Sequence, residues 1–324
     1  MNKLPIANRM PFLIPRRFPA VRLSQNGSHA LLYHTFSERH RPYYCNVTTY
    51  EKFYRDILLL KKQFMFSNAL ERMELNEREL DGASEQKQGS RGTIYLTFDD
   101  SYRSILPVLA FCHANDIPTS IFVNTYLFEN QTLLPKDKLF QALRHAPRPA
   151  ALTFLNETVA MKNNSLLFRD YLAMRWNRRA MATLSYSDYE KEINTFFSAC
   201  PFAPRDPDPD LAMMTPDDLR HIAQDLPSVR ILSHGRSHFD LSRADTASLE
   251  QDIAGSKKTL EHMLGRAVSM FAYPYGFYSE ATLEAVKRAG YTHAIAAGID
   301  DQAQGPRALT LPRTSIDTRA LSVL

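Results

Sequence analysis

The chain repeats one arrangement of hydrophobic and polar positions: an apolar run, a polar cluster, and then a segment with helical periodicity. The run "HALLYHTFS" precedes "NVTTYEKFYRDILLLKKQF", in which Phe53, Ile57, Leu60 and Phe64 recur at the spacing of one helix face. The next run, "TIYLTFDD", precedes the helix-like "YRSILPVLAFCHAND", and "IPTSIFVN" follows as a further strand. Strands that alternate with helices in this way predict a parallel sheet, either open or closed into a barrel.

The same alternation continues in the C-terminal half. The segment "TPDDLRHIAQDL" has the signals of a helix start, with Thr215 as N-cap and Pro216 at the first helical position. Four apolar runs follow this helix, and two amphipathic helices, which end at Gly265 and Gly290, separate the first three of them. These runs are "SVRILSHGRSH", "AVSMFAYPYG", "YTHAIAA" and "LTLPRTSI".

Two stretches interrupt the pattern. Residues 71–92 are charged and rich in Gly, Ser and Gln, which predicts a frayed helix and a loose loop. Residues 125–208 contain the single tryptophan, Trp176, the basic "RWNRR" and a Pro/Asp-rich exit, and we expect a mainly helical insertion there. The predicted organisation is a basic N-terminal arm over residues 1–28 and one α/β domain over residues 29–324 that carries both insertions.

Composition describes an ordinary globular protein. Of its 324 residues 44% are hydrophobic and 23% charged, and a net charge of +4 gives no reason to expect a nucleic-acid partner. Five basic and no acidic residues fall within positions 1–33, which indicates either a solvated arm or a contact for anionic lipid or phosphate. Three widely spaced cysteines, the absence of a signal-peptide pattern and the lack of a long apolar run predict a cytoplasmic protein, with peripheral membrane contact left open.

Polar side chains collect where the apolar runs end, and these ends meet at one edge of a parallel β/α fold. His234 and His238 are four residues apart, a spacing that places two imidazoles on one face of a helical turn. With one carboxylate they make a common ligand set for a divalent metal, whereas the alternative is two surface or capping histidines. In such a site, one of the adjacent Asp99 and Asp100 binds the metal and the other is free to act as a base. The alternative is that the pair only caps a helix or lies in a turn.

The motifs "TFDDSY", "SHGRSHFDLS" and "FAYPYG" resemble the first three motifs of the polysaccharide deacetylase family, carbohydrate esterase family 4, which shares the NodB homology domain. The likeness covers about residues 93–124 and 212–316 and leaves out the insertion at 125–208. The run "LLYHTF" resembles the N-terminal Tyr-His element of the poly-N-acetylglucosamine deacetylase branch. The resemblance implies a distorted (β/α)7 barrel.

The resemblance also implies roles for particular residues. Asp100, His234 and His238 would hold a Zn²⁺-type metal, for which Co²⁺, Ni²⁺ and Mn²⁺ are alternatives, and Asp99 would be the general base. The backbone N–H of Tyr275 would help to stabilise the oxyanion. In the same branch, a histidine that corresponds to His34 protonates the leaving amine.

One position departs from the family pattern. Many members carry an arginine two residues before the proline of the third motif, where this chain has Ala272. Arg313, at the end of "LTLPR", could supply the missing charge from another strand, and the alternative is a purely structural ion pair. Trp176 and its neighbouring arginines either grip a glycan or a diphosphate, or belong to the core and surface of the insertion.

The expected function is that of a metal-dependent deacetylase acting on a glycan or a glycan precursor in cell-surface polysaccharide metabolism. N-acetyl groups of amino sugars are favoured over O-acetyl groups, and a cytoplasmic location favours a lipid- or nucleotide-linked amino sugar. Two alternatives remain open: a metal amidohydrolase acting on a small non-sugar amide, and a non-catalytic glycan-binding protein on the same barrel, which Ala272 favours.

Overall fold

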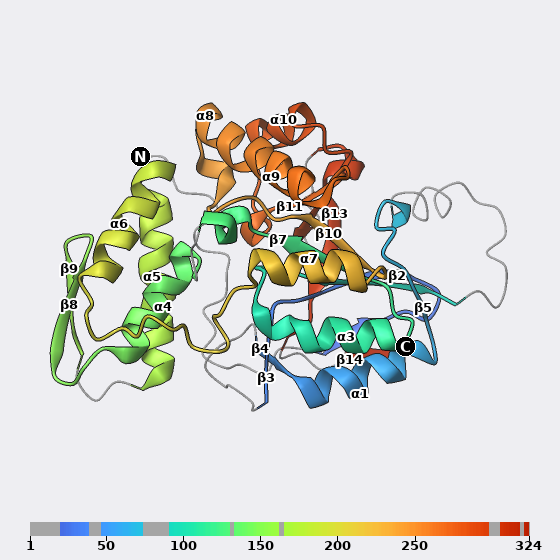
Figure 1. Ribbon diagram of the computed structural model, residues 1–324, viewed down its shortest axis with the longest axis horizontal. Helices are drawn as coiled ribbons and strands as arrows, with labels where there is room; N and C mark the ends of the chain where they lie inside the picture. The colour runs from blue at the N-terminus through green and yellow to red at the C-terminus, as the bar shows by residue number, and fades with distance from the viewer. Residues whose placement is uncertain are drawn as a thin grey trace.

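The structure is a computed structural model that describes residues 20–38, 47–73, 91–129, 133–161, 165–297, 305–317 and 321–323. Seven parallel strands close a barrel, because β13 pairs with β2 and β2 pairs with β6 (Figure 1). The predicted (β/α)7 barrel is therefore confirmed. In order around the barrel the strands are β2 (Ser28–Tyr33), β6 (Thr93–Phe98), β7 (Thr119–Val123), β10 (Val229–Ser233), β11 (Met270–Ala272), β12 (His293–Ala297) and β13 (Leu311–Ser315).

The interior of the barrel is a small apolar cluster to which each of the seven strands contributes. On β6, Tyr95 belongs to this cluster, while its neighbours Ile94 and Leu96 belong to the larger core under the helices. This alternation is the two-residue period of a strand in a barrel wall. The other strand residues of the interior are Ala30, Phe122, Leu232, Met270, Ala272, Ile295 and Leu311.

The end of the barrel at which the strands begin is closed by residues 67–73. Leu70 and Met73 join the interior cluster, and the side chain of Asn68 donates to the carbonyl of Ser228, just before β10. This segment includes the start of the predicted loop at 71–92, of which residues 74–90 lie outside the described residues. The predicted site residues lie at the opposite end, where the strands finish.

Helices surround the barrel at the places that the periodicity predicts. In α1, Phe53, Ile57 and Leu60 are buried, as expected from their spacing. Thr215 and Asp218 form a capping box at the start of α7, and α9 ends at Gly265 with φ of 64°. The helices are α1 (Tyr50–Lys61), α3 (Leu106–Ala114), α7 (Pro216–Asp225), α8 (Thr246–Leu249), which continues through a π-helical turn into α9 (Gly255–Leu264), and α10 (Glu280–Arg288).

Short strands lie outside the barrel, and one of them falls within the predicted arm. β1 (Val21–Leu23) pairs with β14 (Leu321–Val323), and its Val21 and Leu23 are buried. The described end of the arm at 1–28 therefore includes a strand that packs through Val21 and Leu23, while Arg22 is exposed and residues 1–19 lie outside the described residues. The remaining short strands are β3 (Thr35–Ser37), which pairs with β4 (Val47–Thr49), and β5 (Met65–Phe66), which pairs with the start of β6.

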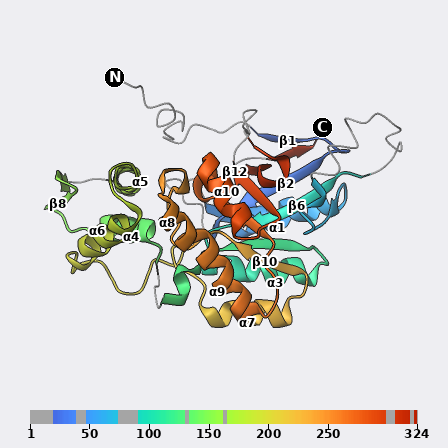
Figure 2. The same ribbon diagram turned by 90° about the horizontal axis from the view of Figure 1, so that it is seen from above.

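Three helices and a β-hairpin lie beside the barrel within the stretch 125–208 (Figures 1 and 2). They are α4 (Pro135–His145), β8 (Ala150–Phe154), β9 (Glu157–Met161), α5 (Leu166–Thr183) and α6 (Tyr186–Ser198). The helices agree with the expected composition of this insertion, whereas no sequence signal had indicated the hairpin. Trp176 is fully buried against Phe154 and Phe196, so it forms the core of the insertion rather than a glycan contact.

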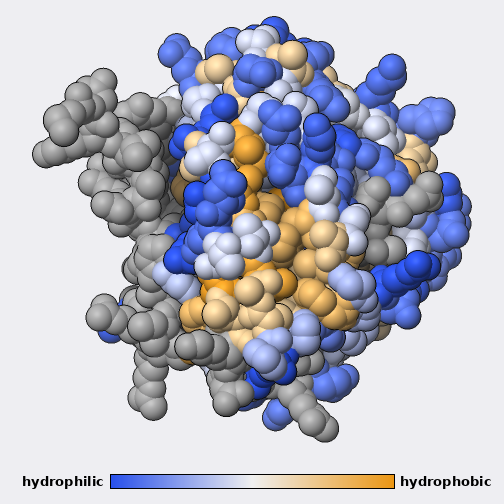
Figure 3. Space-filling model, turned by 90° about the vertical axis from the view of Figure 1, so that its left-hand side faces the viewer, coloured by the Kyte–Doolittle hydropathy of each residue, from blue (hydrophilic) through white to orange (hydrophobic). Residues whose placement is uncertain are grey.

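The outer side of the insertion carries apolar surface. Figure 3 shows an apolar area on the side of the molecule that the insertion forms, and Leu166, Phe168 and Tyr171 at the start of α5 are 40%, 37% and 42% exposed. No helix in the described ranges is long and apolar enough to cross a membrane. Cys112 and Cys200 are buried free thiols, and Cys45 lies outside the described residues.

Candidate active site

The predicted site residues follow strands that are neighbours in the barrel. Tyr33 on β2 is in register with Phe98 on β6, so His34 and Asp99 come directly after two adjacent strands. The backbone N–H of Asp99 donates to the carbonyl of Tyr33 at 3.1 Å, which extends the ladder to the site. The register of β10 with β7 and β11 brings the histidine motif to the same end of the barrel.

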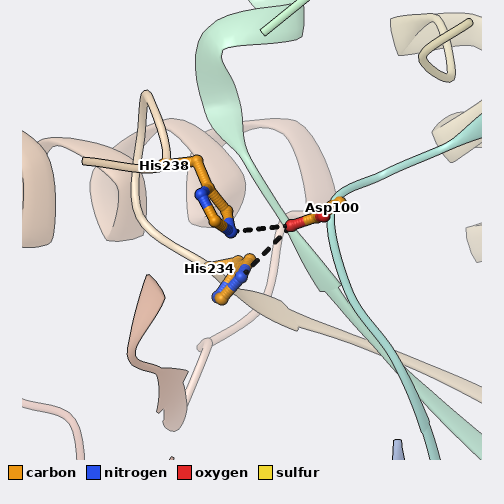
Figure 4. A group of neighbouring side chains, drawn as sticks. All are labelled: Asp100, His234 and His238. Atoms are coloured by element: carbon orange, nitrogen blue, oxygen red, sulfur yellow. Dashed lines mark ion pairs between the residues drawn. The ribbon is translucent and has the colours of Figure 1, made fainter. Parts of the chain in front are cut away.

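The structure brings the three predicted metal ligands together. One oxygen of Asp100 and one ring nitrogen each of His234 and His238 lie within 4.8 Å of one another, and all three residues are buried. Nε2 of His238 is 2.9 Å and Nε2 of His234 is 3.5 Å from the same oxygen, Oδ1 of Asp100 (Figure 4). Both imidazoles point toward this oxygen from the loop after β10.

The protonation pattern of the cluster suits a divalent cation. Nδ1 of His234 lies 2.8 Å from the carbonyl of Ala272, which can only accept, so this nitrogen carries the proton and Nε2 keeps a lone pair. Burial lowers the pKa of His238 to about 4 despite the Asp100 carboxylate, so its ring is neutral at pH 7. Oδ1 of Asp100 is buried and faces the two imidazoles, with no other polar partner among the described residues. Oδ1 of Asp100 and Nε2 of each imidazole thus face one point, as a metal-ligand set requires.

Backbone strain is concentrated around this cluster. Asp100, Ser101, His238 and Tyr275 have φ values of 68°, 59°, 59° and 58°, in the left-handed region that non-glycine residues rarely adopt. Each such residue costs on the order of 1–3 kcal/mol and persists only where the surroundings enforce it. Two of these four residues, Asp100 and His238, are predicted metal ligands, and their backbone conformation sets the direction of their side chains. This concentration of strain indicates a site under functional constraint.

Asp99, the predicted base, is held by Arg313. The guanidinium of Arg313 donates from Nη1 to Oδ1 of Asp99 at 2.7 Å and from Nη2 to Oδ2, and both side chains are buried. Burial alone would raise the pKa of Asp99, but Arg313 together with His234 outweighs it and lowers the pKa. Arg313 thus contacts the base from β13, while at Ala272 the backbone carbonyl orients His234. That this contact replaces the family arginine in catalysis remains a prediction.

His34 is paired with Asp317, a residue that the sequence analysis missed. The carboxylate of Asp317 accepts from the backbone N–H of His34 at 3.1 Å and from its Nδ1 at 2.9 Å, and Ser315 donates to the same carboxylate. Burial disfavours the charged imidazolium, yet Asp317 outweighs this and raises the pKa of His34. Asp317 is an acidic residue just after a strand, the signal that had singled out Asp99, and it could have been found in the same way.

Tyr275 lies next to the metal-ligand cluster. Its ring is 4.3 Å from that of His238, centroid to centroid, in an edge-to-face arrangement. Its hydroxyl accepts from Nδ2 of Asn177 at 2.9 Å, and Oδ1 of Asn177 accepts from the hydroxyl of Tyr189 at 2.8 Å. The side chain therefore contacts the insertion, and the oxyanion role of the Tyr275 backbone N–H remains a prediction.

Two further buried residues at the site gave no sequence signal. Lys136, on α4, donates from Nζ to Oδ2 of Asp100 at 3.1 Å. Asp252, on the turn before α9, accepts from the backbone N–H of Arg236 at 2.9 Å and supports the loop between the two histidines. Gly235 in that loop has φ of 73°, and a Cβ there would collide with the Asp252 carboxylate.

Comparison with known proteins identifies the family. The family model for polysaccharide deacetylase matches residues 86–294, well over half of the chain. The chain belongs to the polysaccharide deacetylase family. The Bacillus subtilis protein YxkH, a relative assigned to the same family, is 29% identical over 104 residues, which are 32% of this chain and 37% of that relative.

Solved structures share the fold. The Streptococcus pyogenes deacetylase PplD is 17% identical, with a TM-score of 0.52 over 90% of this chain and 93% of its own. A polysaccharide deacetylase from Bacillus cereus is 13% identical, with a TM-score of 0.51 over 91% of this chain and 67% of its own. At these identities the likeness establishes the barrel and not the substrate, and membership of the poly-N-acetylglucosamine branch stays a prediction.

Proposed function

We propose that the protein is a metal-dependent deacetylase that removes acetyl groups, foremost N-acetyl groups of amino sugars, from a glycan or a glycan precursor of cell-surface polysaccharide. The observation that carries this proposal is the buried set of Asp100, His234 and His238 directly beside an arginine-paired carboxylate, Asp99. A metal ligand set next to an ionised base is the arrangement that hydrolysis of an unactivated amide needs.

The metal would be held by Asp100, His234 and His238, with Zn²⁺ favoured and Co²⁺, Ni²⁺ or Mn²⁺ as alternatives. When bound, such an ion polarises the acetyl carbonyl and acidifies a water molecule. Asp99 accepts the proton of the attacking water, because Arg313 keeps its carboxylate ionised and fixed in orientation. The backbone N–H of Tyr275 is assigned to the developing oxyanion.

His34 is assigned as the acid that protonates the leaving amine. Its Nδ1 is engaged by Asp317, so Nε2 is the nitrogen from which a proton can be delivered. Asp317 raises the pKa of His34, which favours the imidazolium form that a general acid requires.

The alternatives differ in what they require of the site. A small-amide hydrolase would use the same residues on another substrate. A non-catalytic glycan-binding protein was favoured only by Ala272, and the contact of Arg313 with Asp99 supports the proposal that Arg313 supplies the charge missing at that position. We further propose a cytoplasmic protein whose substrate is a lipid- or nucleotide-linked amino sugar, with peripheral membrane contact through the basic N-terminal arm.

The test is acetate release from a panel of acetylated sugars, acetylated glycans and small amides. Wild type, D99N and the surface control D225N are stripped of metal and then supplied with Zn²⁺ or Co²⁺. We expect metal-dependent release by wild type and D225N, and a kcat lower by about 10²–10⁴-fold in D99N, the usual contribution of a general base. Stoichiometric metal binding without release from any substrate would contradict a catalytic role.

A further inference from the structure

Each helix of the insertion contacts a different barrel loop that carries site residues. Lys136 on α4 bonds to Asp100 in the loop after β6, and Asn177 on α5 bonds to Tyr275 in the loop after β11. Glu190 on α6 accepts from Arg236, between the two metal-ligand histidines, at 2.7 Å. The insertion is therefore joined to the site by polar bonds and not only by apolar packing.

Of these contacts, the one at Lys136 bears directly on a predicted metal ligand. Its ammonium lies against Oδ2 of Asp100, whereas both imidazoles face Oδ1. The two oxygens of this carboxylate thus have separate partners. A carboxylate with both oxygens free can coordinate a cation through one oxygen or through both.

The surroundings hold Lys136 in place. Its side chain is only 8% exposed. Nζ also donates to the hydroxyl of Tyr102 at 2.6 Å and to Oδ1 of Asp137 at 3.4 Å. Tyr102 in turn donates to Asp137, so two buried groups besides Asp100 fix the ammonium against Oδ2. A lysine buried in this way leaves a costly, unpaired group if its partner is lost, and its position is correspondingly well defined.

We propose that Lys136 is a positioning residue: it occupies Oδ2 of Asp100, so that this carboxylate offers the metal Oδ1 alone and coordination positions stay open for water and the acetyl carbonyl. This inference rests on the proposed metal-dependent function. Open positions distinguish a catalytic metal site from a structural one. Residues that orient metal ligands typically contribute about 10–100-fold to metal affinity or activity.

The test compares K136M with a matched control, K138M. Lys138 is on the same helix and is equally buried, but its Nζ bonds to Asn194 at 2.6 Å and not to the metal ligands. Each protein is loaded with Co²⁺, and the visible absorption spectrum, the metal stoichiometry and the thermal unfolding temperature are measured. The values of kcat and KM for acetate release follow on the same samples.

We expect K136M to bind one equivalent of Co²⁺ with a weaker visible spectrum, because a second carboxylate oxygen raises the coordination number. Its kcat should fall by about 10–100-fold, with KM changed much less. K138M should keep the wild-type spectrum and kcat. A wild-type spectrum in K136M, or an equal change in K138M, would overturn the proposal.

A second pair of variants covers the case in which K136M does not fold. K136Q keeps a polar end group in the buried site but is one bond shorter and uncharged, so that it no longer reaches Oδ2 of Asp100. It is compared with K138Q, and a wild-type Co²⁺ spectrum in K136Q would again overturn the proposal. The spectra do not depend on turnover. If wild type binds Co²⁺ but releases no acetate, the proposed function fails, while the spectra still decide the role of Lys136.

Discussion

The barrel and the insertion build the same site by different means. The barrel supplies His34 and Asp99 from the ends of β2 and β6 and Arg313 from within β13, and parallel topology brings these residues together whatever their distance in sequence. The insertion supplies Lys136 and Asn177 from the sides of helices that pack beside those ends. Barrel residues act on the reacting groups in the proposed mechanism, whereas insertion residues act through the barrel residues that they contact.

This difference shows where charge is balanced in the site. Asp99 is neutralised from within the barrel by Arg313, and Asp100 from the insertion by Lys136. The two adjacent carboxylates that end β6 therefore each have a buried cation of their own. Burial alone would raise the pKa values of both aspartates, but these cations and the neighbouring histidines outweigh it and lower both pKa values.

The largest loss of stability and activity is expected from a substitution in the barrel, at Arg313. R313M leaves Asp99 buried without its partner, which should destabilise the fold by about 3–5 kcal/mol, and it should lower kcat because the base loses its orientation. Thermal unfolding and acetate release measure the two effects. R220M, at an exposed ion pair, should lie within about 1 kcal/mol of wild type.

A double variant sharpens this result. D99N/R313M removes both charges and should be more stable than R313M, since the cost lies in the unpaired carboxylate. Full activity in R313M would show that the ion pair is only structural, and the barrel would then lack a substitute for the family arginine.

The next largest effect is expected on the pH dependence of kcat, through the pKa of His34. Asp317 raises the pKa of His34, so D317N should lower it and move the alkaline limb of kcat to lower pH. Removal of a general acid lowers kcat by roughly 100-fold or more. D317N keeps the His34 imidazole, so its loss of kcat at alkaline pH should be smaller than that. A pH–rate profile of wild type and D317N measures the shift, and an unchanged alkaline limb would contradict the acid role.

The same pair has a stability signature with a defined sign. A pKa raised by folding contributes stability that is present below the unfolded pKa and is lost as pH rises through the folded pKa. The stability difference between wild type and D317N should therefore be larger at acidic than at alkaline pH. Denaturant unfolding across this range checks the sign independently of activity.

A smaller effect is expected from the insertion at Asn177. N177A leaves the buried hydroxyl of Tyr189 without its acceptor, which should cost about 1–3 kcal/mol. Its kcat should fall less than that of R313M, because Tyr275 loses only a side-chain contact. If N177A lost as much kcat as R313M, this would contradict the view that the barrel performs the chemistry and the insertion only supports it.

The smallest effect is expected on the outer side of the insertion. Phe168 is 37% exposed on α5, and F168S should change stability by no more than about 0.5 kcal/mol. Activity on soluble acetylated sugars should also be unchanged. A loss of activity there would mean that the apolar surface in Figure 3 takes part in substrate binding.

The amino-acid sequence by itself determined a parallel β/α architecture and the candidate site residues, since both follow from local patterns. The closed barrel and the roles of Asp100 as ligand and Asp99 as base were instead implied by the resemblance to the family. Two-residue and helical periodicities predict strands and helices without knowledge of their partners, and polar residues at strand ends predict where a β/α site forms. Asp99, Asp100, His234 and His238 were found in this way. The cap at Thr215 and the helix end at Gly265 are equally local, and the structure confirms both.

Only the tertiary structure decided which charges meet. Arg313 and Asp99 are 214 residues apart, and His34 and Asp317 are 283 apart, so no local pattern links either pair. The sequence offered Arg313 only as a possible source of the charge missing at Ala272, and it gave no partner for His34. Lys136 begins a helix in a stretch with no family motif, and only the packing of α4 beside β6 places its ammonium on Asp100. Side-chain pairing depends on how elements dock in three dimensions, and periodicity along one chain carries no information about docking.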